Sequence, residues 1–245
     1  MSNLNQICLK MGNTKKIVIT GASRGIGSTI AKAFSDQGAY VVGTCTSPIR
    51  KEFCSEWIIS DFSDINQINE CAERIKEIGP DVLINNAGIN KISSFENIVA
   101  NEFLLIHQIN VFAPFRFCQA AIPNMKTKNW GRIINISSIW GKISKEFRAS
   151  YSASKFALDG ITLALAAEYS KCGILANCVS PGFTDTELTR NILSDIEIRN
   201  IALNIPINRL AAPNEIADYV LWLGSEKNTY VTGQNLAIDG GFTRV

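Results

Sequence analysis

Short apolar segments that alternate with helical segments constrain the fold of this chain more than any other feature. KIVIT (16–20) and YVVGTCT (40–46) are apolar runs of strand length, whereas 27–38 and 65–79 have the apolar spacing of helices. The alternation continues through expected strands at 81–88, 131–138, 175–182 and 234–239 and expected helices at 97–128, 151–171 and 213–224. Strands that are apolar throughout are typical of a parallel sheet covered on both faces. The sequence therefore predicts an α/β fold in which a doubly wound parallel sheet carries helices on both faces.

Size and composition narrow the class of protein. The 245 residues, 46% of them hydrophobic, suffice for one large core, and we expect a single domain over 15–245 after a loose extension at 1–14, in which Met11 is an alternative start. The 24 basic and 22 acidic residues nearly cancel, and no basic stripe indicates a nucleic-acid partner. No apolar run is long enough to span a membrane. The seven cysteines lack a C-x-x-C pair, so we expect reduced thiols in a cytoplasmic protein and no metal site.

A glycine-rich segment follows the first expected strand. TGASRGIG (20–27) opens a helix at the carboxyl edge of the sheet, where ligands of doubly wound folds bind. Its glycines let the backbone turn tightly, and the helix N-terminus offers N–H groups to a pyrophosphate, as in a Rossmann-type dinucleotide site. The second strand ends in GTCTSPIR, without the acid that binds the ribose hydroxyls of NAD. That absence, with Arg24 in the loop, favours NADP(H); the alternative is that Arg24 is a solvated surface charge.

A phenol and an amine lie one helical turn apart in YSASK. Tyr151 and Lys155 therefore share one face of the expected helix. Ketone reduction needs a hydride on carbon and a proton on oxygen, and a cation beside a phenol is expected to lower its pKa and make it a better proton shuttle. Ser138, at the end of the preceding strand, is placed to donate to the substrate carbonyl. His107, the only histidine, lies among apolar residues of a helix, and we expect it to be packed rather than to act as a hydrolase base.

Together these motifs resemble the short-chain dehydrogenase/reductase family, from about Lys15 to the end of the chain. The motifs occur in the order that the family shows: TGASRGIG, SDFSD (60–64), NNAG (85–88), Asn110, Ser138, YSASK, PGFTDT (181–186) and YVTGQNLAIDGG (230–241). Within the family, the sequence is similar to bacterial 3-oxoacyl-(acyl carrier protein) reductases.

The resemblance implies a set of site residues. Four would be catalytic, namely Asn110, Ser138, Tyr151 and Lys155, with Asn110 holding a water linked to the lysine. Arg24 and Thr46 would lie near the 2′-phosphate, and Asp61 and Phe62 at the adenine. The residues implied to bind NADP(H) are Gly21, Ser23, Arg24, Gly25, Ile26, Gly27, Thr46, Asp61, Phe62, Asn86, Ala87, Gly88, Tyr151, Lys155, Pro181, Gly182, Thr184 and Thr186. The resemblance also implies a substrate lid at 187–210 and a homotetramer.

We therefore expect an NADP(H)-dependent enzyme that reduces a ketone, with a 3-oxoacyl thioester as the specific prediction. Where carrier-protein-dependent reductases are expected to have arginine, this chain has Asn129 and Cys172. A sugar, polyol, nucleotide-sugar or small-ketone dehydrogenase therefore stays an alternative. A third hypothesis is a protein that senses NADP without turnover, although the complete set of Ser138, Tyr151 and Lys155 argues against it.

Overall fold

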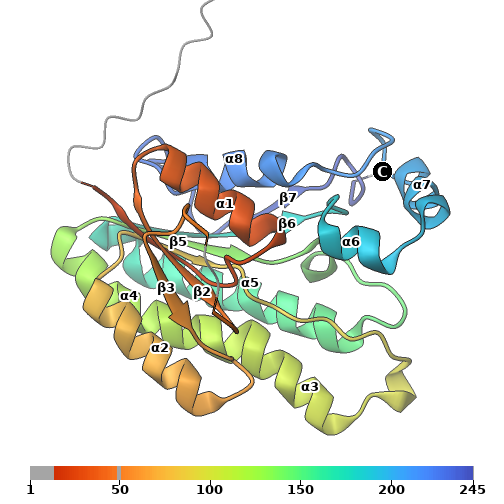
Figure 1. Cartoon of the computed structure of the whole chain (residues 1–245), viewed down its shortest axis with the longest axis horizontal. Helices are drawn as coiled ribbons and strands as arrows, with labels where there is room; N and C mark the ends of the chain where they lie inside the picture. Colours follow the sequence, from red (N-terminus) through yellow and green to blue (C-terminus); the bar gives the residue numbers. More distant parts are fainter. Residues whose placement is uncertain (1–13, 49–50, 245) are drawn as a thin grey trace, which may run out of the picture.

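A seven-stranded parallel sheet forms the centre of the protein (Figure 1). The computed structural model describes residues 14–48 and 51–244. The strands lie in the order β3-β2-β1-β4-β5-β6-β7, so the chain reverses its direction of winding between β1 and β4, where doubly wound sheets bind ligands. Their bounds are β1 Lys16–Ile19, β2 Tyr40–Cys45, β3 Glu56–Ile59, β4 Val82–Asn85, β5 Gly131–Ile136, β6 Ile174–Pro181 and β7 Asn235–Ile238.

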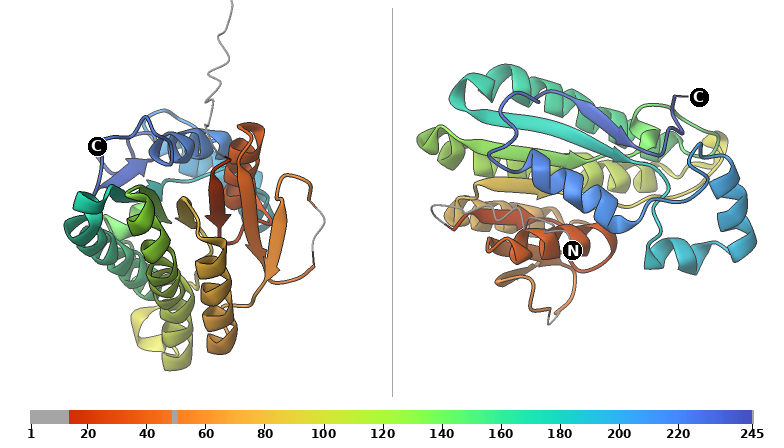
Figure 2. Two further views of the ribbon diagram at one scale, coloured as in Figure 1. Left: turned by 90° about the vertical axis from the view of Figure 1, so that its left-hand side faces the viewer. Right: turned by 90° about the horizontal axis from the view of Figure 1, so that it is seen from above.

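Helices cover both faces of this sheet (Figures 1 and 2). One face carries α1 (Gly25–Asp36) and α8 (Pro213–Leu223); the other carries α2 (Ile65–Ile78), α4 (Ala113–Lys128) and α5 (Ala149–Tyr169), with α3 (Ala100–His107) leading towards α4. Because successive strand residues point to opposite faces, β1 contributes to two separate cores. Val18 packs in one core, and Ile17 and Ile19 pack in the other. The predicted doubly wound architecture is confirmed.

Two features differ from the expected elements. The strand β3 was not predicted, and the described part of its connection to β2 contains no helix. The long helical region expected at 97–128 is divided by a π-helical segment, Gln108–Phe112, which contains Asn110.

Two short helices form most of the segment expected to be the lid. They are α6 (Glu187–Ile192) and α7 (Asp195–Leu203), and they stand to one side of the sheet (Figure 2). A capping box between Ser194 and Glu197 starts α7. The expected N-terminal extension lies outside the described residues except for Thr14. In the described parts of the chain, no helix is long and apolar enough to cross a membrane, and the six cysteines found there are free thiols.

Candidate active site

The predicted site residues come together at the carboxyl edge of the sheet. The glycine loop follows β1, the NNAG motif follows β4, Ser138 follows β5, and 181–186 follow β6. Because all seven strands are parallel, these segments lie along one edge. Helix α5 contributes Tyr151 and Lys155 to the site, and the π-helical segment contributes Asn110.

The glycine loop is a cradle made of backbone. Gly21 and Gly25 have φ values of +64° and +54°, which favour glycine. At Gly27, a Cβ atom would lie 2.3 Å from the carbonyl oxygen of Gly21 and 2.4 Å from Nδ2 of Asn86. The first turn of α1 also contains no acidic residue. The loop thus leaves the N-terminus of α1 open to an anionic group such as a pyrophosphate.

The NNAG motif braces this loop. Nδ2 of Asn86 donates to the carbonyl oxygens of Thr20 (3.0 Å) and Gly21 (3.1 Å). The hydroxyl of Thr20 accepts from the backbone N–H groups of Asn86 (2.9 Å) and Ala87 (3.0 Å), and the Thr44 hydroxyl accepts from Gly21 (3.0 Å). Asn86 and Ala87 therefore shape the cradle. Thr20 and Thr44 were not predicted as site residues, although each is a threonine at or near the end of a buried strand.

The four residues that the resemblance implies at the adenosine end of the cofactor differ in how accessible their side chains are. The ring of Phe62 is buried against Phe117, with ring centroids 5.0 Å apart, so only its backbone is available to an adenine. Oδ1 of Asp61 accepts from the backbone N–H of Ser63 at 2.9 Å. Arg24 and Thr46 are exposed.

The three side chains expected to carry the reaction form one group. Ser138 begins the short turn η3 (Ile139–Gly141), where its Oγ accepts from the N–H of Trp140 at 3.2 Å. Ser138 lies close enough to Tyr151 for its hydroxyl to lower the pKa of the phenol. Nζ of Lys155 lies 5.5 Å from the centroid of the Tyr151 ring and donates to the carbonyl of Ile136 at 2.8 Å.

The pKa of Tyr151 is shifted in the direction opposite to the prediction. Burial raises the pKa of Tyr151, and this outweighs the lowering by the Ser138 hydrogen bond and by Arg148. Burial also lowers the pKa of Lys155, to about 8. The predicted lowering by Lys155 was therefore wrong, since its ammonium is directed to a carbonyl and burial dominates at the phenol. A raised pKa keeps the phenol protonated near neutrality, which is the form that donates a proton to a carbonyl.

Arg148 is a site residue that the sequence analysis missed. It lies one helical turn before Tyr151, is half-buried, and lowers the pKa of the phenol. Its guanidinium has no hydrogen-bond or ion-pair partner among the residues that the structure describes. A basic residue at i−3 from the tyrosine was the signal that could have found it.

Asn110 is fully buried and uses its side chain to position the loop after β4. Its Oδ1 accepts from the N–H of Ile89 (2.9 Å), and its Nδ2 donates to the carbonyl of Ile89 (2.9 Å) and to Oγ of Ser154 (3.0 Å). A Cβ atom on Gly88 would lie 3.2 Å from this Oδ1 and 3.5 Å from Nζ of Lys155. The asparagine, the lysine and this glycine are thus neighbours, while the role of Asn110 in holding a water stays a prediction.

The segment 181–186 closes the other side of the cradle. Pro181 ends β6, and a Cβ atom on Gly182 would lie 2.8 Å from Cα of Asp239. The Thr184 hydroxyl donates to the carbonyl of Gly182 at 3.2 Å. The Thr186 side chain caps α6, and its methyl carbon is 3.8 Å from the position of a Cβ on Gly25. This segment therefore reaches the glycine loop from the opposite side of the cleft.

Comparisons with known proteins agree with this geometry. A family model described as enoyl-(acyl carrier protein) reductase matches residues 21–243. The 3-oxoacyl-[acyl-carrier-protein] reductase FabG of Escherichia coli K12 is 36% identical over 240 residues, which cover 94% of this chain and 98% of that protein. The chain belongs to the short-chain dehydrogenase/reductase family.

The solved structures that this short-chain dehydrogenase/reductase resembles include enzymes named for other substrates. A 4-hydroxyisoleucine dehydrogenase complexed with NADH has a TM-score of 0.88 and 29% identity, covering 95% of this chain and 100% of that one. A gluconate 5-dehydrogenase from Burkholderia cenocepacia, in complex with NADP and tartrate, has a TM-score of 0.85 and 26% identity, covering 94% and 96%. The family thus implies a nicotinamide dinucleotide, and the cradle fits one, because its glycines leave backbone N–H groups unobstructed by any Cβ.

The only histidine, His107, lies away from this group. The ring Nδ1–H of His107 donates to the carbonyl of Phe103 at 2.9 Å, and the two rings pack with centroids 4.2 Å apart, so the histidine is packed as expected.

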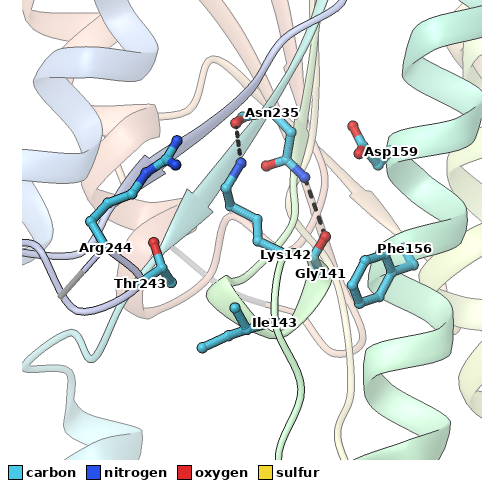
Figure 3. Close-up of a pocket in the computed structure, with 8 residues that line it drawn as sticks. All are labelled: Gly141, Lys142, Ile143, Phe156, Asp159, Asn235, Thr243 and Arg244. Carbon is cyan, nitrogen blue, oxygen red and sulfur yellow. Dashed lines mark hydrogen bonds between the residues drawn. The ribbon is translucent and has the colours of Figure 1, made fainter.

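A hollow of about 390 Å³ lies beside η3 (Figure 3). There, Nζ of Lys142 donates to the carbonyl of Asn235 at 2.7 Å, and Nδ2 of Asn235 to the carbonyl of Gly141 at 3.4 Å. None of the predicted site residues lines this hollow, and its two bonds tie the Ser138 turn to β7.

Proposed function

We propose that this short-chain dehydrogenase/reductase is an NADP(H)-dependent enzyme that reduces a ketone to a secondary alcohol, with 3-oxoacyl thioesters as its substrates. The observation that carries the proposal is the group formed by the Ser138 hydroxyl, the Tyr151 phenol and the Lys155 ammonium, which lies 5.5 Å from the centroid of the phenol ring. This group lies on the same edge of the sheet as the glycine cradle.

The residues of the chain account for the proton half of the reaction. When bound, the nicotinamide supplies the hydride. The hydroxyls of Ser138 and Tyr151 both donate to the carbonyl oxygen, where negative charge develops. Tyr151 then transfers its proton, and the cation of Arg148 stabilises the phenolate that remains. Asn110 holds the loop at Gly88 against Lys155 and so fixes the position of the ammonium.

Two observations support a preference for NADP(H) over NAD(H). Strand β2 ends at Cys45, and Thr46, Ser47 and Pro48 follow it without a carboxylate that would repel a 2′-phosphate. Arg24, the residue before α1, is exposed and has no ion-pair partner among the residues described. A guanidinium at this end of the loop can bind a phosphate through two N–H groups.

A second candidate substrate class, hydroxy acids, is favoured by Arg148. Its half-buried guanidinium lies one turn from the proton donor, and an arginine binds a carboxylate through two parallel hydrogen bonds. Gluconate, 4-hydroxyisoleucine and tartrate, named for the two solved relatives above, all carry a carboxylate. The 36% identity to the acyl-carrier-protein reductase keeps the thioester as the first candidate.

A substrate panel tests these proposals. We expect NADPH oxidation with acetoacetyl thioesters of coenzyme A and acyl carrier protein, at a kcat/KM at least about tenfold above that with NADH, since one charge-assisted hydrogen bond contributes that much. Equal rates with both cofactors would refute the NADP(H) preference.

The same panel separates the candidate substrates. Two results together would favour hydroxy acids over thioesters as the substrates. The wild-type protein would act only on gluconate-like hydroxy acids, and Arg148→Met would raise KM for these acids but not for neutral polyols. NADPH binding without turnover of any panel member would instead indicate a nucleotide-sensing protein.

We also propose that the chain forms a homotetramer. The neighbouring helices α3, α4 and α5 expose the large apolar side chains Leu104, Phe115, Phe156 and Leu163. Burial of such side chains against a second copy is favourable. Light scattering is expected to give the mass of four chains, reduced by Leu163→Glu but not by Leu203→Glu, whose exposed side chain lies on α7. A monomeric wild-type protein would contradict the proposal.

A further inference from the structure

The turn that follows Ser138 is too short to fix its own position. It is η3, a single 3₁₀ turn of three buried residues, Ile139–Gly141. One turn has few hydrogen bonds of its own, so its place in the protein depends on the contacts of its side chains. Oγ of Ser138 accepts from the backbone N–H of Trp140 at 3.2 Å. A shift of Trp140 therefore moves or releases the Ser138 hydroxyl.

The ring of Trp140 packs against two phenylalanines from distant parts of the chain. Phe183 follows β6, and Phe242 follows β7. The centroid of the Trp140 ring lies 6.3 Å from each phenylalanine centroid, and the two phenylalanine centroids are 5.4 Å apart. All three interplanar angles are 84°, the edge-to-face arrangement that aromatic rings favour. Each ring thus supports the other two, and loss of Phe242 removes one of the two aromatic neighbours of Trp140.

The backbone on both sides of Phe242 is fastened to a single carboxylate. Oδ1 of Asp239 accepts from the N–H of Gly241 at 2.9 Å. Oδ2 of Asp239 accepts from the N–H (2.9 Å) and the hydroxyl (2.7 Å) of Thr243. This turn is also closely packed, because a Cβ atom on Gly241 would lie 3.0 Å from Cγ of Pro206. The Phe242 ring is therefore held by a fixed turn.

The same part of the chain also holds the other end of η3. Nζ of Lys142, the residue after η3, donates to the carbonyl of Asn235 at 2.7 Å, and Asn235 is the first residue of β7. Thr243 lines the same hollow as Gly141 and Lys142 (Figure 3). The segment 235–243 thus contacts η3 in two places, at Lys142 through a hydrogen bond and at Trp140 through the Phe242 ring.

We propose that Phe242 is a positioning residue for the reaction, which acts through Trp140 to hold the Ser138 hydroxyl in place. The inference rests on the proposed function, in which Ser138 donates to the substrate carbonyl. Because the Ser138 oxygen accepts from the N–H of Trp140, its own proton stays available for that donation. A displacement of about 1 Å in such a group lowers the rate by about 100-fold. Phe242 acts in this way without contact to the substrate.

The first test is steady-state kinetics with the panel ketone that the wild-type protein reduces fastest. We expect Phe242→Ala to lower kcat by about 10- to 100-fold, because the hydroxyl is misplaced where charge develops. KM and the calorimetric Kd for NADPH are expected to stay within about threefold of wild type, and the titration also shows that the variant is folded. Phe242→Tyr keeps the ring and should restore most of the loss in kcat.

A double variant shows whether the effect passes through Ser138. In a Ser138→Ala background, the further change Phe242→Ala is expected to lower kcat by no more than about twofold, since the hydroxyl that Phe242 positions is already gone. Losses that multiply in the double variant would show that Phe242 acts by another route. Unchanged kcat in Phe242→Ala would show that it has no role. Either result overturns the inference.

Tyr219→Ala is a matched control. Tyr219 stacks on Trp222 of α8 with ring centroids 6.0 Å apart, so this variant also loses an aromatic contact with a tryptophan. Its kcat is expected to equal that of wild type, and a loss as large as in Phe242→Ala would mean that general loosening of the core is the cause and would refute the positioning role. Absence of turnover in the wild-type protein would refute the proposed function, whereas full turnover in Phe242→Ala refutes the inference alone.

Discussion

Replacement of Tyr151 by phenylalanine is expected to lower kcat for ketone reduction by about 10²- to 10⁴-fold, the usual contribution of a positioned proton donor. The change removes only the phenol oxygen atom and leaves the ring beside Lys155. The glycine cradle is braced by Asn86 and Thr20, not by Tyr151, so Kd for NADPH is expected to stay within about threefold of wild type. Steady-state kinetics and a calorimetric titration measure the two quantities.

Tyr169→Phe is the matched control for this substitution. Tyr169 is the last residue of the same helix, α5, at the opposite end from Tyr151, and packs against the core. Loss of its hydroxyl should leave kcat unchanged. Substantial reductase activity in Tyr151→Phe would assign the proton to another donor, and a parallel loss of NADPH binding would make Tyr151 a cofactor residue rather than a proton donor.

Most of the sheet could be predicted because its strands are apolar throughout. Residues 17–19, 82–85 and 174–181 are buried on both faces, and helical segments separate them in the sequence. The strand β3 carried no such signal. It is a partly exposed edge strand, Glu56–Ile59, and its connection to β2 is too short to contain the helix that would have marked a crossover.

The candidate site, like the sheet, has features that the sequence could predict and features that it could not. The order and spacing of motifs were sufficient to select Ser138, Tyr151 and Lys155, because each follows a strand or shares a helix face. The sign of the Tyr151 pKa shift could not be read from the spacing. It depends on burial of the phenol and on the bond from Lys155 to the Ile136 carbonyl, both of which arise only in the folded protein.

Gly27→Ala is expected to weaken NADPH binding by about 5- to 150-fold. The added Cβ would lie 2.3 Å from the carbonyl oxygen of Gly21 and 2.4 Å from Nδ2 of Asn86, so the loop or its brace must move. Movement of Asn86 breaks its bonds to Thr20 and Gly21 and displaces the N–H groups that face the pyrophosphate. Overpacking of this kind costs about 1–3 kcal/mol in stability, and the same loss of binding free energy raises Kd by about 5- to 150-fold.

Gly160→Ala separates this clash from the general effect of replacing a helical glycine. Both glycines lie within helices, α1 and α5, and no atom is within 4 Å of a Cβ built on Gly160. Alanine there is expected to stabilise the fold by about 0.5–1 kcal/mol through helix propensity, with no change in Kd for NADPH. Gly27→Ala makes the same gain in helix propensity. The differences between the two variants in thermal stability and in Kd for NADPH therefore measure the effect of the steric clash at Gly27. A Gly27→Ala protein that binds NADPH like wild type would show that the cradle does not hold the pyrophosphate, since no cradle of this geometry accommodates the added methyl group without moving.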